Sequence, residues 1–216
     1  MTADLRAELC RVAASLYARG YVHASAGNIS ARTEDGGVLI TPTDACLGAL
    51  EPARLALVDA DGVQTAGDPA SKTLALHRRI YAADPDAGCV IHTHSTHLVA
   101  LSLLQADPAA DLVPPITPYF VMKVGHVPLI PYHRPGDPAV ADRVAEAIAA
   151  RRSAGTPIRA VMLARLGPNV WHHTPALASA VLEELEETAR LWWLTRAAPL
   201  QERQIEELRA QFDARW

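Results

Sequence analysis

Two histidines separated by one residue form the strongest chemical feature of the sequence. His92 and His94 lie in the segment CVIHTHSTH. On a β-strand this spacing directs both side chains to one face, with the Cα atoms about 6–7 Å apart, so both imidazoles can reach one metal ion. Imidazole nitrogens suit Zn, Fe, Ni or Cu. The pair indicates a metal site, although two histidines without a ligand can share this spacing. His97 fits the start of the following helix better than a supporting role at the metal.

Three further segments carry groups that could bind an anion. Ser25 and Asn28 belong to the small-residue turn ASAGNIS, whose backbone N–H groups could hold a phosphate. Thr43 adds a hydroxyl in TPT, beside a proline turn. Ser71 and Lys72 precede an expected helix, where the helix dipole and the ammonium group both favour an anion. An ordinary Gly-Asn turn and a simple helix cap at Ser71 are the structural alternatives.

Polar residues also gather near the central strands expected from the sequence. Lys72 and Lys123 are the only lysines in a chain whose basic residues are otherwise arginines. Tyr119 precedes Lys123, and the segment YHRPG, at 132–136, is polar and rigid. Such a loop fits the border of a binding site, and it fits a structural turn equally well.

Composition limits the classes of protein to which the chain can belong. The 216 residues are 50% hydrophobic, with a net charge of −4, which argues against disorder and against general affinity for nucleic acid or anionic membranes. The three cysteines form no CxxC pair, which fits a reducing compartment. No apolar run reaches the ~18 residues of a membrane span, and the N-terminus reads as a helix. We expect one cytoplasmic domain over residues 1–216.

Helical and strand patterns alternate along the whole chain. Apolar spacing predicts an N-terminal helix that ends at Gly20. Further helices are expected over 71–83, 97–104, 138–152, 176–197 and 201–216. Strands are expected after the ASAGNIS turn and over 36–43, 53–62, 88–92, 127–132 and 158–167. Hairpin-like turns in the first part predict an α/β domain with a mixed, largely antiparallel sheet.

The order of these segments resembles the class II aldolase/adducin family from about residue 5 to residue 195. The shared pieces include ASAGNIS, LITPTDACLGAL, PASKTLALHRRIY, VIHTHSTHLVALSLL and TPYFVMKVGHVPLIPYHRPGD. AVMLARLGPNV and ALASAVLEELEETARLWW complete the set. Within the family the chain most resembles the sugar-acid phosphate decarboxylases, which convert a 3-oxo-tetronate 4-phosphate to dihydroxyacetone phosphate and carbon dioxide.

The resemblance implies a three-layer α/β fold with a central, mainly antiparallel sheet flanked by helices. It also implies a small-molecule substrate and a homotetramer with metal sites near subunit interfaces. The family chemistry is a lyase reaction in which a divalent metal, expected to be zinc, stabilises an enediolate left by C–C bond cleavage.

By this resemblance, His92 and His94 are two of three zinc ligands. Lys72 meets the substrate carboxylate or a neighbouring oxygen, and Tyr119 joins it among the catalytic residues. The phosphate-binding residues implied are Ser25, Asn28, Thr43 and Ser71.

Three positions depart from the family pattern. Leu166 occupies the position of the third zinc-binding histidine and has no donor atom, whereas a catalytic zinc normally keeps three protein ligands. Thr73 replaces the glutamate that acts as general acid/base, and loss of such help typically costs about 10²–10⁴-fold in rate. Asp44 replaces the glycine of a phosphate-binding Thr-Gly pair and places a carboxylate there.

Two main hypotheses follow from these departures, and the first is slightly favoured. In the first, the chain is a metal-dependent lyase whose metal is completed by an unforeseen ligand. In the second, it is a catalytically silent relative that keeps the fold for binding or assembly. A third possibility is a metal-free biosynthetic enzyme with Lys72 and Tyr119 as polar anchors. The ligands considered for recruitment are His97, His133, His172 and His173.

Overall fold

The core of the fold is one mixed, mainly antiparallel β-sheet. The computed structural model describes residues 2–104 and 111–216, whose strands form one eight-stranded sheet in the order β4-β3-β2-β1-β5-β8-β7-β6. Only the β6–β7 pair is parallel, so the expected mainly antiparallel sheet is confirmed. The strands are β1 (Asn28–Arg32), β2 (Val38–Ile40), β3 (Ala56–Val58), β4 (Gln64–Ala66), β5 (Cys89–His92), β6 (Leu129–Ile130), β7 (Ala160–Leu163) and β8 (Gly167–His172).

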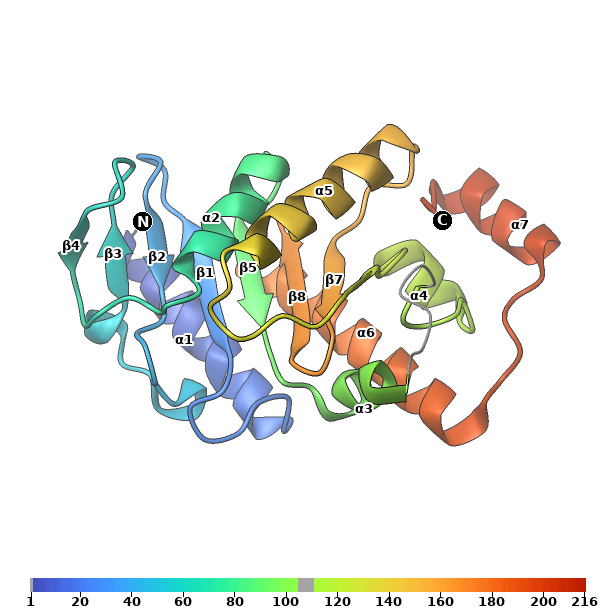
Figure 1. Ribbon diagram of the computed structural model, residues 1–216, viewed down its shortest axis with the longest axis horizontal. Helices are drawn as coiled ribbons and strands as arrows, with labels where there is room; N and C mark the ends of the chain where they lie inside the picture. The colour runs from blue at the N-terminus through green and yellow to red at the C-terminus, as the bar shows by residue number, and fades with distance from the viewer. Residues whose placement is uncertain (1, 105–110) are drawn as a thin grey trace.

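Helices cover both faces of this sheet (Figure 1). Helices α1, α3 and α6 supply one apolar layer, and α2 and α5 supply the other. Helix α4 packs against α6 and α7, and α7 lies beyond the β6 end of the sheet. The α-helices are α1 (Thr2–Ala18), α2 (Leu74–Ala83), α3 (Thr96–Leu104), α4 (Pro118–Lys123), α5 (Ala139–Ser153), α6 (Pro175–Thr195) and α7 (Glu202–Phe212).

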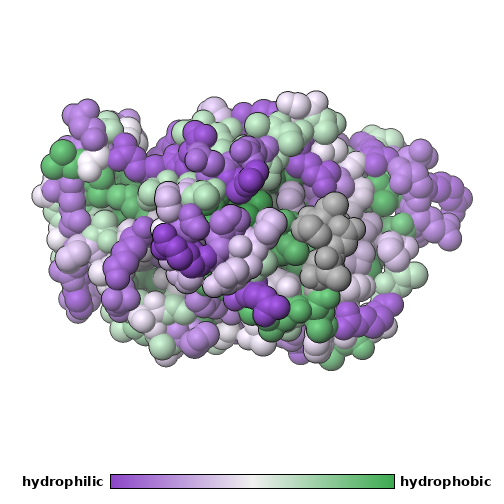
Figure 2. Space-filling model, in the orientation of Figure 1, coloured by the Kyte–Doolittle hydropathy of each residue, from purple (hydrophilic) through white to green (hydrophobic). Residues whose placement is uncertain are grey.

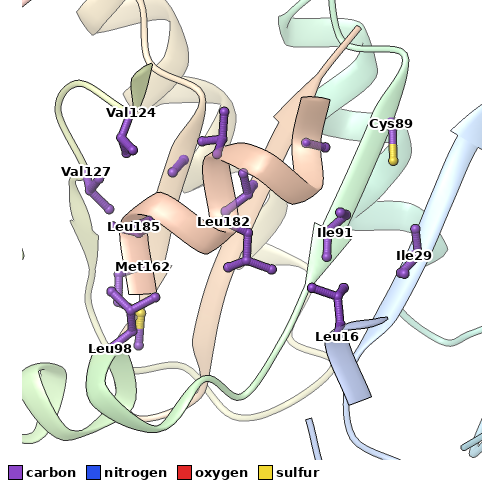
Figure 3. Close-up of a cluster of buried hydrophobic side chains, with 14 of the residues drawn as sticks. Leu16, Ile29, Cys89, Ile91, Leu98, Val124, Val127, Met162, Leu182 and Leu185 are labelled. Carbon is purple, nitrogen blue, oxygen red and sulfur yellow. The ribbon is translucent and has the colours of Figure 1, made fainter. Parts of the chain in front are cut away.

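The side chains of strand β5 alternate between the two apolar cores on either face of the sheet. Successive side chains of a strand point to opposite faces. Cys89 and Ile91 therefore enter the core beneath α1, α3 and α6, a cluster that also contains Leu182 of α6 (Figure 3). Val90 enters the core beneath α2 and α5. The same alternation directs His92 to the α2/α5 face, which becomes polar at this end of the strand.

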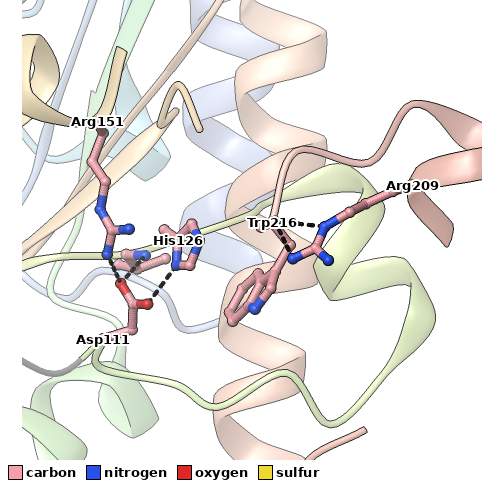
Figure 4. Close-up of polar contacts among 6 residues, drawn as sticks. Asp111, His126, Arg151, Arg209 and Trp216 are labelled. Carbon is pink, nitrogen blue, oxygen red and sulfur yellow. Dashed lines mark hydrogen bonds and ion pairs between the residues drawn. The ribbon is translucent and has the colours of Figure 1, made fainter. Parts of the chain in front are cut away.

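A charged cluster holds the chain's C-terminal segment against the domain. Asp111 accepts hydrogen bonds from Val127 N (3.1 Å) and Arg151 (3.2 Å) and is paired with His126 Nδ1 (2.5 Å). The Trp216 ring stacks on His126 with 4.2 Å between ring centroids (Figure 4). This segment thereby covers α4 without contributing to the histidine pair.

Several elements differ from the sequence expectation. Strand β4, helix α4 and strand β8 were not expected from the sequence. Strand β8 was missed because it opens with Gly167 and Pro168, which are typical of a turn at the end of the preceding strand. Helix α2 begins at Leu74 rather than at 71, because Ser71 O accepts a hydrogen bond from Leu74 N in a turn. The three cysteines are free, as expected. No helix in the described ranges is long and apolar enough to cross a membrane.

Candidate active site

Three buried polar side chains lie side by side across the centre of the sheet. In the strand register, His92 of β5 is opposite Asn28 of β1 on one side and Asn169 of β8 on the other. Directly opposed residues in a sheet point to the same face, with Cβ atoms about 4.5–5.5 Å apart. Asn28, His92 and Asn169 are 7%, 5% and 0% exposed. The sheet therefore holds His92 between two amides.

Backbone hydrogen bonds bring the three anion-binding segments to this end of the sheet. Thr41 exchanges bonds with Ile29, through Thr41 N to Ile29 O (3.0 Å) and Ile29 N to Thr41 Oγ1 (3.2 Å). Thr43 N donates to Pro69 O (2.9 Å), and Ser71 N donates to Thr41 O (3.2 Å). The segments ASAGNIS, TPT and PASKT are thus joined to one another and, through β1, to β5.

Two glycines let neighbouring loops press directly against the histidine segment. A Cβ on Gly27, where φ is +84°, would lie 2.9 Å from His92 O. A Cβ on Gly167, where φ is +153°, would lie only 1.8 Å from Thr93 O. Both distances are shorter than real Cβ contacts, and both backbone conformations favour glycine. The loops that flank the histidine pair are therefore fixed by backbone packing.

His92 is held in an orientation suited to binding a metal. Its Nδ1 lies 2.9 Å from Pro168 O. With Nδ1–H donating to that carbonyl, Nε2 keeps its lone pair for a ligand, as is usual for metal-binding histidines. Burial, and secondarily His94, lower the pKa of His92 to about 4, so the ring is neutral at neutral pH.

The spacing of His92 and His94 fits one tetrahedral ion. Their ring centroids are 5.1 Å apart and their planes are inclined by 70°. With Zn–N bonds of ~2.0–2.1 Å, two imidazoles on one tetrahedral zinc have ring centroids roughly 5 Å apart. His94 is half-buried, and burial followed by His23 lowers its pKa. Both predicted ligands therefore present neutral nitrogen donors at neutral pH.

His23 also stands next to this pair. Its ring centroid lies 6.1 Å from that of His94, with the planes at 74°. His23 is exposed and directly precedes the ASAGNIS turn. Sequence reasoning did not select it, because nothing in the sequence indicated that this turn faces the end of β5.

The segment at 71–73 presents hydroxyls and an exposed lysine. Ser71 Oγ lies 3.0 Å from Thr73 Oγ1 and accepts a hydrogen bond from Thr73 N at 3.4 Å. Lys72 is exposed between them. Thr73 is the N-cap residue of α2 but makes no side-chain cap bond. This position therefore offers hydroxyl donors and one cation, but no carboxylate.

The other positions singled out from the sequence lie outside this cluster or offer no donor. Leu166 packs its partly buried side chain against the apolar core beneath α2 and α5. Asp44 is exposed, with a left-handed backbone at φ 55°. Tyr119 is 63% exposed on α4, a helix that packs against α6 and α7. Tyr119 therefore faces solvent, and its role at the histidines stays a prediction.

The histidines proposed for recruitment do not join the pair either. His172 is opposite Cys89, at the other end of β5 from His92, and His173 follows it. The remaining two have partners at Nδ1: His97 Nδ1 lies 2.8 Å from Glu186, and His133 Nδ1 lies 2.7 Å from Pro131 O, while neither contact involves Nε2. The backbone N–H groups of His97 and Leu98 also donate to Glu186, so His97 has the role of a helix-start residue.

A cluster of buried polar side chains next to His92 was also not foreseen. Ser30 Oγ lies between two side chains of α2. It is 2.7 Å from His77 Nδ1 and 2.7 Å from the Tyr81 hydroxyl. Complete burial lowers the pKa of His77 to about 3, with a smaller effect from His92. Of the five buried side-chain atoms that have no partner in the described chain, four belong to these three residues: Asn28 Oδ1, His77 Nε2, Asn169 Oδ1 and Asn169 Nδ2. Unpaired buried polar atoms are costly, so these groups are suited to a polar ligand or water.

A separate hollow lies at the opposite end of the sheet. It has a volume of about 380 Å³ and is lined in part by Asp84, Arg152 and His172. The Asp84 carboxylate already accepts hydrogen bonds from Arg152 (2.8 Å) and from Trp171 Nε1 (2.8 Å). The Asp84 carboxylate in this hollow is paired, whereas buried polar atoms next to His92 have no partner in the described chain, so we assign the chemistry to the histidine end.

The residues present fit a divalent metal in part. Among the described residues, no three His, Cys, Asp or Glu side chains are already arranged as a ligand set. His92 and His94 have the spacing, neutral state and buried support that a metal requires. Leu166 contributes nothing, so a complete site needs a further donor.

The fold and this site define a class of protein. Residues 7–193 match the family described as "Class II Aldolase and Adducin N-terminal domain". The chain belongs to the class II aldolase/adducin family, as the resemblance predicted.

Particular relatives narrow the comparison. The chain is 56% identical to a 3-oxo-tetronate 4-phosphate decarboxylase of Cupriavidus necator over 98% of this chain and 97% of that protein. It is 43% identical to the enzyme of the same name from Escherichia coli K12, over 91% and 90% of the two chains. The crystal structure of YgbL from Escherichia coli superposes with a TM-score of 0.88 at 42% identity, covering 96% and 99% of the two chains.

More distant structures share the fold. The L-fuculose-1-phosphate aldolase of Thermus thermophilus matches with a TM-score of 0.74 at 27% identity, over 91% and 98% of the two chains. The family and the identities of the decarboxylases identify the chain as a carbon–carbon lyase. The prediction of an enzyme of the carbon–carbon lyase class is therefore confirmed.

Proposed function

We propose that the chain decarboxylates a phosphorylated 3-oxo sugar acid, with a divalent metal bound through His92 and His94. One observation carries this proposal: the histidine pair and the three anion-binding segments meet at one end of the sheet. The names and identities of the relatives support the same substrate class. When bound, the metal supplies Lewis-acid stabilisation of negative charge on oxygen.

The exposed segments have complementary tasks toward such a substrate. Thr43 and Ser71, with the backbone N–H groups of the glycine-containing turn at Ser25 and Asn28, supply hydrogen bonds for a phosphate. The Lys72 ammonium binds the carboxylate before it leaves as carbon dioxide. The two anionic ends of the substrate are thereby held apart, with the carbonyl between them.

The hydroxyl at 73 favours decarboxylation over aldol cleavage. When the carboxylate leaves, the electrons of the broken C–C bond move to the neighbouring carbonyl oxygen and form an enediolate. No base is needed for that step, and solvent water can then protonate the carbon. Aldol cleavage must first remove a proton from a hydroxyl, and Thr73 cannot accept it near neutral pH. The substitution therefore impairs an aldolase more than a decarboxylase.

We also propose that the active form is a homo-oligomer, with a tetramer as the family expectation. In this proposal, exposed Tyr119 acts at the histidine pair of a second copy. Several large apolar side chains are exposed near the ends of α3 and α6, where the surface is partly green in Figure 2. They are Leu103, Leu104, Leu191, Trp193 and Leu194.

Tag-free protein, reconstituted with zinc, tests the reaction. We expect release of carbon dioxide and dihydroxyacetone phosphate from 3-oxo-tetronate 4-phosphate, and little cleavage of L-fuculose 1-phosphate. Removal of metal by a chelator should abolish turnover, and added zinc should restore it. Full turnover after complete removal of the metal would overturn the metal requirement. Absence of carbon dioxide release from the reconstituted oligomer would overturn the reaction.

A further inference from the structure

We propose that His23 is the third protein ligand of the metal, in place of the donor that Leu166 lacks. This inference rests on the proposed metal-dependent function, because it concerns how the same metal is held. It assigns a metal-binding role to a residue on the loop that precedes β1. The site then has three histidines, His23, His92 and His94.

The distances place His23 within reach of the pair. The ring centroids of His92 and His94 are 5.1 Å apart, and those of His94 and His23 are 6.1 Å apart. Ligands of one tetrahedral zinc have centroids roughly 5 Å apart. His92 and His94 already meet this value, and the His23 ring must move at least about 1 Å closer to His94 and approach His92 as well. Rotation of the exposed His23 side chain is the movement that the inference requires.

The backbone of the His23 loop is fixed while its side chain is free to rotate. Ala26 N donates to His23 O at 2.9 Å, and Ala24 takes a left-handed conformation with φ 48°. Gly27 presses this loop against His92 O. The His23 side chain is exposed, and within the described ranges its ring makes no hydrogen bond. The loop therefore carries the ring to the site without committing its nitrogens.

The neighbours of the pair leave few alternatives. Leu166 lacks a donor atom, and Glu186 holds His97 at the start of α3 through both its Nδ1 and its backbone N–H. Asn169 offers only a neutral amide oxygen, a weaker donor for zinc than imidazole. A set of three histidines matches the number of protein ligands that catalytic zinc sites use and leaves the fourth position for substrate. Three neutral imidazoles also leave the full charge of the ion, which favours an anionic substrate.

Titration of the metal-free protein with cobalt(II) chloride tests this assignment without an activity assay. The native chain should bind one cobalt per chain and develop strong visible absorption bands, as expected for a site of low coordination number. His23→Ala should weaken cobalt binding about 100-fold, because even indirect partners of metal ligands contribute about 10–100-fold. The matched control His172→Ala removes an imidazole at the other end of β5 from His92 and should bind cobalt like the native chain.

A second substitution separates loss of a ligand from loss of the loop. Adding Leu166→His to the His23→Ala protein should restore tight cobalt binding, since a donor then returns from the opposite flank. Binding by His23→Ala within threefold of the native value would overturn the inference, while the proposed decarboxylation would stand if that variant still required metal. A native chain that binds no cobalt yet releases carbon dioxide would overturn both this inference and the metal requirement.

Discussion

Acid should destabilise this protein through a histidine that cannot take up a proton while folded. His77 is completely buried, and burial lowers its pKa from 6.5 to about 3. Between these two pH values, His77 therefore binds a proton in the unfolded chain but not in the folded chain. The stabilising contribution of the neutral ring is fully present above pH 6.5 and is lost as the pH falls from there toward 3.

The two pKa values give the size of the effect. Each pKa unit corresponds to about 1.4 kcal/mol. Between pH 7.5 and pH 4.5, this single group should lower the free energy of unfolding by about 2.5 kcal/mol. That is a substantial fraction of the 5–15 kcal/mol typical of a folded domain (roughly 0.1 kcal/mol per residue).

A comparison of the native protein with His77→Asn isolates the pH-dependent contribution of His77 to the free energy of unfolding. Asparagine can place a polar atom near the position of Nδ1, so the contact with Ser30 Oγ can persist while the titrating ring is lost. The free energy of unfolding is measured with urea in the presence of a chelator at pH 7.5, 5.5 and 4.5. Its decrease from pH 7.5 to pH 4.5 should be about 2.5 kcal/mol smaller in the variant than in the native protein. The absolute stability of the variant can be lower throughout, because only the pH dependence is compared.

Ser30→Ala is the matched control, because it removes the hydrogen bond to His77 and keeps the ring. It should lower stability while retaining the acid sensitivity of the native chain. Parallel stability curves for native protein and His77→Asn would refute the argument, since they would show that burial of this ring does not govern the titration.

Three further predictions concern the site and its supports. Gly167→Ala should lower the free energy of unfolding by about 3 kcal/mol or more, since its Cβ would lie 1.8 Å from Thr93 O; urea unfolding measures this, and an unchanged midpoint would contradict the close packing. Lys72→Met should raise KM for a carboxylate-bearing substrate at least about tenfold, because it removes one charge-assisted bond; steady-state kinetics check this, with unfolding unaffected as the control. Asp84→Ala should destabilise the protein by about 2 kcal/mol, because it leaves the buried Trp171 Nε1–H without its acceptor; a loss below about 0.5 kcal/mol would count against this account.

The sequence was sufficient for the parts of the fold that rest on local pattern. The apolar run at β5 and the helical spacing of α2, α5 and α6 identified the main elements. The motif order identified the family and hence the antiparallel sheet. Strand β8 was missed because Gly167 and Pro168 are typical turn residues, and only pairing with β5 makes them the start of a strand. Helix α4 was hidden by its opening proline.

The candidate site was predictable only where its members belonged to a known motif. The pairing of β1 with β5, which places Asn28 beside His92, is a long-range property that no local spacing shows. His23 and Asn169 were missed for this reason, since each acquires its significance from a neighbouring strand. Tyr119 illustrates the opposite limit, because its predicted role depends on a second chain.

The close backbone contacts at Gly27 and Gly167 bear on how such an enzyme can change over evolutionary time. At Gly167 the contacts are with backbone alone, whereas a Cβ on Gly27 would meet the Val22 side chain at 2.7 Å as well as His92 O at 2.9 Å. A metal-binding group could therefore be gained on one flank before it is lost on the other, without moving the strands. A chain with histidine at both 23 and 166 would keep its metal throughout such an exchange. Under the proposed assignment of His23, the third ligand can therefore change between positions 23 and 166 while the metal stays at His92 and His94.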